Sequence, residues 1–322
     1  MYPAILAAES LIRPYVLETP LAYSPALSAR CGYPVWLKLE CVQHTGSFKL
    51  RGAAHALLRL DAETRRRGVV TASTGNHGEA MAYMAQRLGI PCTLCVPETI
   101  TPAKLAHFAY YPVEVRVTGA DSAETELTAR ALATAEGLRY VSPYNDPDVI
   151  AGQGTLGPEL LRQCPDLGTV LVPIGGGGLI GGIAAYLKAV RPEIQVIGCQ
   201  PAHDAAMYHA LRTGQVVDVP ALPTLSDGTA GGLEPDTLTL PLCQDHVDDI
   251  TLIEESEIRQ ALRWLVTHHQ LLVEGAAALQ VAALLRDPAP RYPGPVVLIL
   301  CGRKLGLDTL RDLLLTGEGL PG

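Results

Sequence analysis

The chain has 322 residues, of which 48% are hydrophobic and 18% are charged, so it has the composition of a globular protein with a large core and length for two domains. Its formal net charge of -8 argues against nucleic acid or an anionic membrane as a partner, and no apolar run is long enough to suggest a membrane span. The first residues lack the basic start and unbroken apolar stretch of a signal peptide, so we expect a cytoplasmic protein.

Strands and helices alternate along the first half of the chain. Hydrophobic periodicity and turn residues predict helices near 5–15, 24–29, 50–60, 79–88, 102–108 and 122–137, and strands at 35–39, 68–72, 92–96 and 113–117. Residues 140–147 have the composition of a linker that returns to a second unit.

The second half repeats the alternation. We expect helices at 150–162, 180–190, 205–212, 254–268 and 274–285, and strands at 169–173, 195–200 and 296–300, with a long loop at 213–235. Strands that alternate with helices at this spacing indicate an α/β fold of parallel sheets with helices on both faces.

Lys49 lies in residues 43–52, where a buried strand gives way to a helix. The partial positive charge of a helix N-terminus and the apolar neighbour Phe48 both disfavour protonation of an amine at this place. Lys49 is therefore a candidate for an uncharged nucleophile that binds a carbonyl cofactor covalently. From this stretch alone, the alternative is a surface lysine at a helix start.

Four consecutive glycines separate the strand at 169–173 from the next helix. Their backbone N–H groups can close on a phosphate, and the helix dipole adds attraction. The spacing Gly176-x-Gly178-x-x-Gly181 also fits a dinucleotide fingerprint, but Gln200 stands where that fingerprint needs an acid, so we expect a single phosphate group. A tight turn between strand and helix is the alternative. The expected loop comprises Gly175, Gly176, Gly177, Gly178 and the following Leu179.

A second strand-to-helix junction carries polar residues instead. It offers free N–H groups, two hydroxyls and an amide to an anion such as a carboxylate, although the same residues are also good helix caps. The residues are Ser73, Thr74, Gly75, Asn76 and His77. His77 could be a base or a buried structural group.

Ligands of open parallel sheets bind beyond the carboxyl ends of the strands. Four loops occupy such positions, namely 43–49, 73–78, 175–178 and 301–304, and we expect them to converge on one cleft.

These motifs together resemble the fold-type II family of pyridoxal-phosphate enzymes, and within it the branch of serine/threonine dehydratases and serine racemases. The resemblance covers nearly the whole chain, and the Ser-Phe-Lys-x-Arg-Gly core with the tetraglycine loop is its most specific part. The matching stretches are 38–40 (KLE), 45–53 (TGSFKLRGA), 73–78 (STGNHG), 149–155 (VIAGQGT), 175–178 (GGGG) and 226–228 (SDG).

The resemblance implies a fold like that of the tryptophan synthase β-subunit, with two open, mainly parallel twisted sheets flanked by helices. It implies a cofactor-binding domain formed by residues 1–60 and 146–322 and a smaller substrate-side domain formed by residues 61–145. Family precedent also suggests a homodimer or homotetramer.

The resemblance further assigns roles at the site. Lys49 would hold pyridoxal 5'-phosphate and later act as the base at the substrate Cα, Phe48 would pack against the ring, and Asn76 would bind the ring hydroxyl. The glycine loop would hold the phosphate, and the loop 73–77 would bind the substrate carboxylate. Cys301 falls where the family usually has Ser or Thr facing the pyridine nitrogen.

Two residues and one segment bear on which activity of the family this chain would have. Glu274 matches a family acid near the cofactor, with a helix N-cap as the alternative. Thr74 stands where dehydratases often have Ala and racemases have the Ser that acts as second base, so it is a candidate catalytic residue. The residues 200–206 lack the acids of the racemase-type cation site, so we expect no metal there.

The expected function is the elimination of water from a 3-hydroxy amino acid, L-threonine or L-serine, to give a 2-oxo acid and ammonia. The alternatives are an amino acid racemase and a 3-hydroxyaspartate dehydratase. The lysine context disfavours β-replacement as in cysteine synthases, and Gln200 disfavours a nucleotide-binding oxidoreductase. A non-catalytic protein that binds the cofactor also remains open.

Overall fold

The computed structural model describes residues 1–287 and 291–315 and contains two sheets. One has six strands in the order β1-β2-β10-β7-β8-β9, and the other has four in the order β5-β4-β3-β6. All neighbouring strands are parallel except β1 and β2. The predicted fold class, two mainly parallel sheets with flanking helices, is confirmed.

The six-stranded sheet draws its strands from both ends of the chain. Its strands are β1 (Leu21–Tyr23), β2 (Val35–Lys38), β7 (Thr169–Pro173), β8 (Gln195–Pro201), β9 (Asp249–Ile253) and β10 (Val296–Ile299). The strands β7 and β10 are fully buried, as expected for central parallel strands that helices cover on both faces. The helices of this unit are α1 (Tyr2–Ile12), α2 (Pro25–Cys31), α3 (Lys49–Leu58), α8 (Pro147–Gly154), α9 (Leu156–Gln163), α10 (Gly178–Val190), α11 (Ala206–Thr213), α12 (Thr239–His246), α13 (Glu255–His269), α14 (Gly275–Arg286) and α15 (Leu307–Leu315), with short 3-10 turns η1 (Glu40–Val42) and η2 (Asp227–Thr229).

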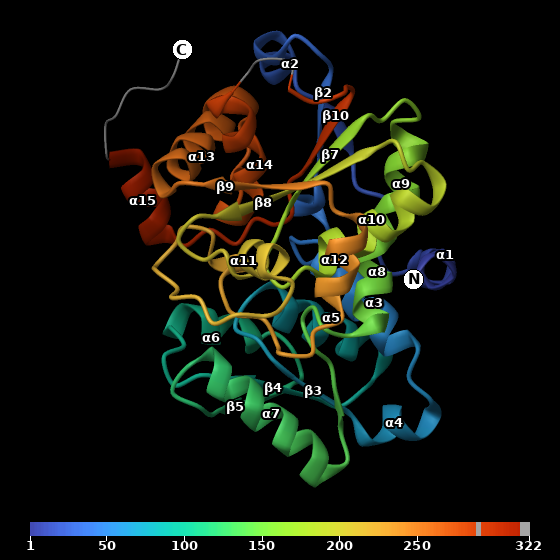
Figure 1. The fold of residues 1–322 in the computed structure, drawn as a ribbon. Coiled ribbons are helices and arrows are strands. Elements are labelled where there is room, and N and C mark those ends of the chain that lie inside the picture. Colours follow the sequence, from blue (N-terminus) through green and yellow to red (C-terminus); the bar gives the residue numbers. More distant parts are fainter. Residues whose placement is uncertain (288–290, 316–322) are drawn as a thin grey trace.

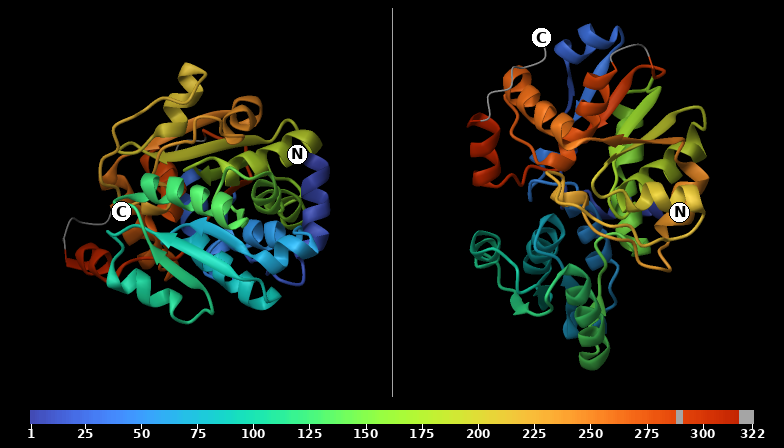
Figure 2. Two further views of the ribbon diagram at one scale, coloured as in Figure 1. Left: turned by 90° about the horizontal axis from the view of Figure 1, so that it is seen from below. Right: turned by 60° about the vertical axis from the view of Figure 1, so that its left-hand side comes forward.

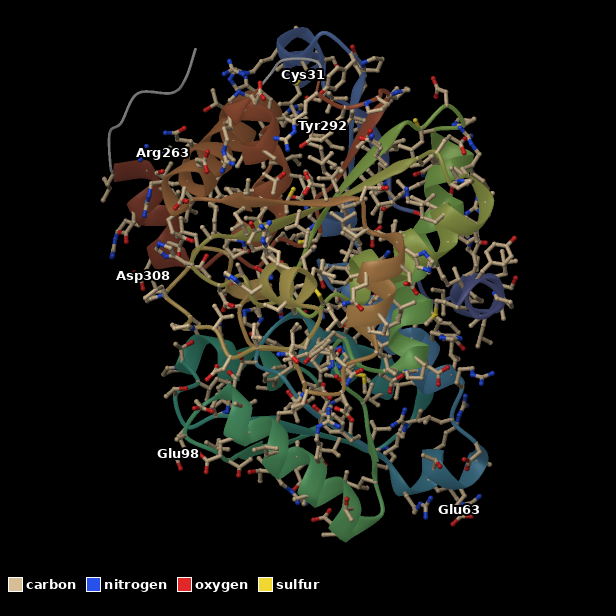
Figure 3. The ribbon with its side chains drawn as sticks, in the orientation of Figure 1. Cys31, Glu63, Glu98, Arg263, Tyr292 and Asp308 are labelled. Atoms are coloured by element: carbon tan, nitrogen blue, oxygen red, sulfur yellow. The ribbon has the colours of Figure 1, made fainter. Side chains whose placement is uncertain are left out.

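The four-stranded sheet and its helices form the other end of the molecule (Figures 1 and 2). Glu63 and Glu98 lie on the outer side of this unit, whereas Cys31 and Tyr292 lie at the opposite end of the chain's fold (Figure 3). The unit comprises β3 (Val69–Ala72), β4 (Cys92–Val96), β5 (Glu114–Val117), β6 (Arg139–Tyr140), α4 (Ala62–Arg67), α5 (Asn76–Leu88), α6 (Pro102–Phe108) and α7 (Ser122–Glu136). The domain boundaries at residues 60 and 146 stay a prediction.

Apolar packing joins the two units through α3. Leu50 and Leu57 of α3 lie in one buried cluster with Met81 and Met84 of α5 and Leu94 of β4. A second and larger cluster fills the space around the six-stranded sheet, where α10 and α14 both pack against β7 and β8. The helix that begins with Lys49 therefore packs on α5 of the four-stranded unit and on α8 of the six-stranded unit.

Several elements differ from the sequence prediction. The single helix expected at 150–162 is two helices, because Pro158 in the first turn of α9 has no N–H to continue the hydrogen-bond ladder of α8. At the turn between them, the Thr155 hydroxyl donates to the Gly152 carbonyl at 2.7 Å. The expected linker at 140–147 begins with strand β6, which pairs with β3. The sequence prediction also missed β1, β9, α12 and α15. No helix in the described ranges has the length and apolarity to cross a membrane.

Candidate active site

Lys49 is the first residue of α3 and extends toward the chain that follows β6. Its Nζ donates a hydrogen bond of 2.7 Å to the carbonyl of Pro143 and lies 5.2 Å from the centroid of the Phe48 ring. Burial lowers the pKa of the Lys49 amine to about 8, although Cys301 and Glu274 oppose the shift. A large fraction of this amine is therefore uncharged slightly above neutral pH, as a nucleophile or base requires.

The lysine loop lies beside the loop that follows β10. Phe48 N donates to Cys301 O at 3.0 Å, and Arg303 N donates to Gly46 O at 3.1 Å. Ser47 and Gly302 form an isolated β-bridge between the same two segments. The backbone thus fixes the position of Lys49 relative to the end of β10.

The loop 73–77 connects β3 to α5, whose first helical residue is Asn76 and whose N-terminus has no side-chain cap. The amide of Asn76 donates to both oxygens of Glu274, at 3.0 and 2.9 Å, while its Oδ1 is buried without a partner. Ser73 and Thr74 are partly exposed on this loop, and Ser73 Oγ accepts from Gly75 N at 3.3 Å. The uncapped N–H groups of α5 can therefore donate hydrogen bonds to an anion.

His77 lies behind this loop and does not have the properties of a base. Its Nε2 lies 3.4 Å from Val141 O, and its Nδ1 is buried without a partner. Burial lowers the pKa of His77 to about 3, and the charge of Lys49 adds to the shift. The ring is therefore neutral near pH 7, which favours the structural interpretation of this residue.

Glu274 stands at the N-cap of α14, but its side chain does not cap that helix. Its carboxylate accepts from the Asn76 amide and from Lys304 N at 3.0 Å, and the Cys301 sulfur lies 3.7 Å from Oε1. Burial raises the pKa of Glu274, and burial together with this carboxylate raises the pKa of the Cys301 thiol well above its usual value. Cys301 is therefore a neutral thiol at the edge of the site.

The glycine loop separates β7 from α10, which starts at Gly178 without a side-chain cap. A Cβ at Gly176 would lie 2.3 Å from Cγ of Tyr144, and one at Gly175 would lie 2.9 Å from the backbone of Thr229. Gly177 has a positive φ of 83°. Only glycines fit between these neighbours, and the buried Leu179 follows them in α10.

These contacts bring all four predicted loops together. The loops 43–49 and 301–304 touch directly, Glu274 joins Asn76 to the latter, and the segment at Pro143 and Tyr144 joins Lys49 to the glycine loop. The predicted convergence is thus present. Pro143, Tyr144 and Thr229 are site neighbours that the sequence prediction missed, because no motif marks a loop residue that acts through its backbone or its packing.

A cluster of four buried charges lies beneath the lysine loop, defined by Lys38, Glu40, Arg51 and Glu159. Arg51 donates to Glu40 at 2.8 and 2.9 Å and to Glu159 at 2.9 and 3.0 Å. Lys38 pairs with Glu159 at 2.5 Å. Since Arg51 is two residues from Lys49, this charged cluster anchors the start of α3.

No group of three or more His, Cys, Asp or Glu side chains within residues 1–287 and 291–315 is arranged to hold a metal ion.

Comparison with known proteins gives one consistent result. The family described as pyridoxal-phosphate dependent enzyme matches residues 12–302. The L-threonine ammonia-lyase of Geobacter sulfurreducens is 38% identical over 309 residues, which are 96% of this chain and 77% of that protein. Among solved structures, the processed form of threonine deaminase isoform 2 from Solanum lycopersicum has a TM-score of 0.90 at 31% identity, covering 97% of this chain and 86% of that one. Maize serine racemase has a TM-score of 0.89 at 30% identity, covering 97% and 96%.

Proposed function

The chain belongs to the family of pyridoxal-phosphate dependent enzymes, and from this premise we propose that it eliminates water from a 3-hydroxy amino acid, L-threonine or L-serine. The products are a 2-oxo acid and ammonia. The β-hydroxyl leaves as water, and one water is consumed when the released enamine hydrolyses.

The residues present fit the cofactor. A Cβ at Gly175, Gly176 or Gly177 would collide with its neighbours, so the chain here must be glycine, and it leads into the uncapped N-terminus of a 13-residue helix, which suits a phosphate. Asn76 carries a buried oxygen without a partner, which could accept a hydrogen bond from a ring hydroxyl. Lys49 has the lowered pKa that covalent attachment of an aldehyde needs. The residues that would hold the cofactor are Phe48, Lys49, Asn76, Gly175, Gly176, Gly177, Gly178, Leu179, Glu274 and Cys301.

When bound, the cofactor supplies an electron sink for the charge that develops at the substrate Cα. Lys49 would hold the cofactor, and its uncharged amine would take the proton from the substrate Cα. The hydrogen bond to Pro143 O aims that amine, and burial keeps its pKa near the operating pH.

Cys301 and Glu274 set the electrostatics beside the lysine loop. A neutral thiol does not enforce a charged pyridine nitrogen in the way that an ionised carboxylate would. Glu274 orients Asn76 and Lys304 N instead of pointing at Lys49. Ser73, Thr74, Gly75, Asn76 and His77 form the loop that would receive the substrate carboxylate at the N-terminus of α5.

The observation that carries the proposal is the placement of Lys49, at the meeting point of the glycine loop, the carboxylate loop and the end of β10. The roles of the individual residues are part of the proposal, as is the division into a cofactor side (1–60 and 146–322) and a substrate side (61–145). We propose further that the protein works in the cytoplasm as a homodimer or homotetramer.

A racemase is the second candidate. Thr74 places a partly exposed hydroxyl on the carboxylate loop, where a second acid or base could reach the Cα, and serine racemase of maize has the same fold. The methyl group of Thr74 and the neutral His77 make this the weaker proposal.

The test is the release of ammonia and 2-oxo acid from purified protein with cofactor, using L-serine, L-threonine, D-serine and L-threo-3-hydroxyaspartate. We expect release from L-threonine or L-serine and a loss of at least about a thousandfold in Lys49→Ala. Interconversion of L- and D-serine without release would favour the racemase. If protein that binds the cofactor shows neither release of 2-oxo acid nor racemisation, the proposal is overturned.

A further inference from the structure

A loop of the six-stranded unit is fastened to the four-stranded unit through the side chain of Glu234. This carboxylate accepts hydrogen bonds from Arg130 of α7 at 2.5 Å, from Ser142 Oγ at 3.1 Å and from the Asn145 amide at 2.6 Å. The Glu234 side chain is only 14% exposed. Three donors on a nearly buried carboxylate form a fixed junction that is stronger than an isolated surface ion pair.

Two further hydrogen bonds run between the same segments. Glu234 N donates to the Tyr144 hydroxyl at 2.8 Å, and Leu238 N donates to Asn145 Oδ1 at 2.8 Å. We call the five residues Arg130, Ser142, Tyr144, Asn145 and Glu234 the Glu234 clasp. The clasp has partners on both of its sides, so it holds the loop and the segment at 142–145 in one relative position.

Arg130 is itself immobilised. Its guanidinium lies 4.3 Å from the centroid of the Tyr140 ring and donates to Glu126 of the same helix at 2.9 and 3.2 Å. An arginine fixed by stacking and by a second carboxylate loses little further freedom when it binds Glu234. The clasp is therefore anchored to α7 and β6.

The clasp reaches the active site through Tyr144 and its neighbour. The ring of Tyr144 lies against Gly176, so closely that a Cβ there would overlap the ring, and its backbone lies against Gly178. The carbonyl of Pro143 accepts the hydrogen bond of Lys49 Nζ. The consecutive residues 143–145 thus connect Glu234 with both the glycine loop and Lys49.

We propose that Glu234 is a positioning residue that holds Tyr144 against the glycine loop and Pro143 against Lys49, and so prepares the site for the cofactor before it binds. Glu234 acts through the clasp and touches neither the cofactor nor the reacting atoms. The inference rests on the proposed function only in taking pyridoxal phosphate as the ligand, and it holds for elimination and racemisation alike.

The test is a titration of the apo-protein with pyridoxal 5'-phosphate, followed by absorbance, for wild type and Glu234→Ala. We expect the Kd of the variant to rise about tenfold, as for the loss of a hydrogen bond to a charged group. In the apo-protein, the amides of residues 234 and 238 should exchange hydrogen faster than in wild type. Arg130→Ala removes the clasp from its other side and should give the same pattern.

Glu136→Ala is the matched control, because it removes an ion pair of α7 with Arg116 that does not leave the four-stranded unit. Its Kd and amide exchange should equal those of wild type. Ser142→Ala removes one of the three donors to Glu234, together with the hydrogen bond that Ser142 Oγ accepts from Asn145 N at 3.0 Å. It keeps Arg130 and the Asn145 amide on Glu234 and should shift Kd in the same direction, which keeps the test informative if Glu234→Ala prevents folding.

An unchanged Kd in both Glu234→Ala and Ser142→Ala would overturn the inference. A fall in melting temperature without a change in Kd would also overturn it, because it would mark a purely structural contact. A wild-type protein that binds the cofactor but releases no 2-oxo acid would contradict the proposed function and leave the clasp to be judged by Kd alone.

Discussion

Two sets of ion pairs lie around Lys49, and they differ in burial. The charged cluster of Lys38, Glu40, Arg51 and Glu159 has side chains that are 0–2% exposed. The second set joins residues of the two units, and its side chains are more exposed to solvent. Its pairs are Arg130–Glu234 with side-chain exposures of 39% and 14%, Lys304–Glu79 with 29% and 17%, and Lys104–Asp227 with 47% and 59%.

The difference in burial implies a difference in energy. Removing one partner of a buried ion pair leaves an uncompensated charge in a medium that solvates it poorly, whereas exposed partners are solvated with or without each other. The contacts that cost most free energy to break therefore lie beneath Lys49. Those that cross between the units cost less, and among them the less exposed Glu234 junction should cost more than the exposed Lys104–Asp227 pair. Lys49 sits on the rigid side of that division.

The largest effect should come from Arg51→Ala. This change leaves Glu40 without an ionic partner in the interior and leaves Glu159 paired with Lys38 alone, so we expect the free energy of unfolding to fall by about 3–5 kcal/mol. Denaturant unfolding followed by circular dichroism measures it. Arg162→Ala, on the same helix as Glu159, removes exposed pairs with Glu9 and Glu18 and should cost less than about 1 kcal/mol. Equal losses in the two variants would contradict the comparison.

A substitution in the glycine loop should have an intermediate effect, because Gly176 packs against the Tyr144 ring. In Gly176→Ala the new Cβ would overlap the Tyr144 ring, so the loop must shift, at a cost of about 1–3 kcal/mol. We expect this cost to be visible as a weaker Kd for pyridoxal 5'-phosphate. Gly181→Ala, one turn further along α10, places its Cβ 3.4 Å from Leu242 and should bind the cofactor as wild type does. If Gly181→Ala weakens the binding of pyridoxal 5'-phosphate and Gly176→Ala does not, the assignment of the loop 175–178 as the phosphate site is wrong.

Lys104→Ala should have the smallest effect. Its 3.3 Å pair with Asp227 is exposed on both sides, so we expect a change of less than about 1 kcal/mol that disappears at high salt. Thermal unfolding at low and high ionic strength measures it. A loss comparable to that of Arg51→Ala would show that the crossing contacts are not the weaker set.

Sequence patterns were sufficient for elements whose signals are local. The bounds predicted for β4, α6 and β7 agree with the structure, because each is a continuous apolar or capped run between turn residues. The two-residue strand β6 was missed because only its pairing with β3 makes it a strand. The break between α8 and α9 was missed although Pro158, in the first turn of α9, marks it, since this residue has no N–H to donate to the Gly154 carbonyl.

The candidate site divides in the same way. Motifs located Lys49, the glycine loop and the carboxylate loop, and the structure brings them together. The charged cluster was missed, because Arg51 meets Glu159 across 108 residues of sequence and neither has a local signal of burial. The Glu234 clasp was missed for the same reason, since Glu234 lies in a loop that carries no periodic pattern.

The most direct test of the account is the pH dependence of covalent attachment of pyridoxal 5'-phosphate to the apo-protein. Borohydride traps the product on the peptide that contains Lys49, and Nα-acetyl-lysine reacting with the same cofactor corrects for the ionisation of the cofactor itself. Because burial lowers the pKa of Lys49 to about 8, the uncharged amine predominates above that pH. We predict a rate that rises through pH 8 and is level above it. A rate that still climbs toward pH 10, as for an ordinary lysine, or label on another lysine, would contradict the account.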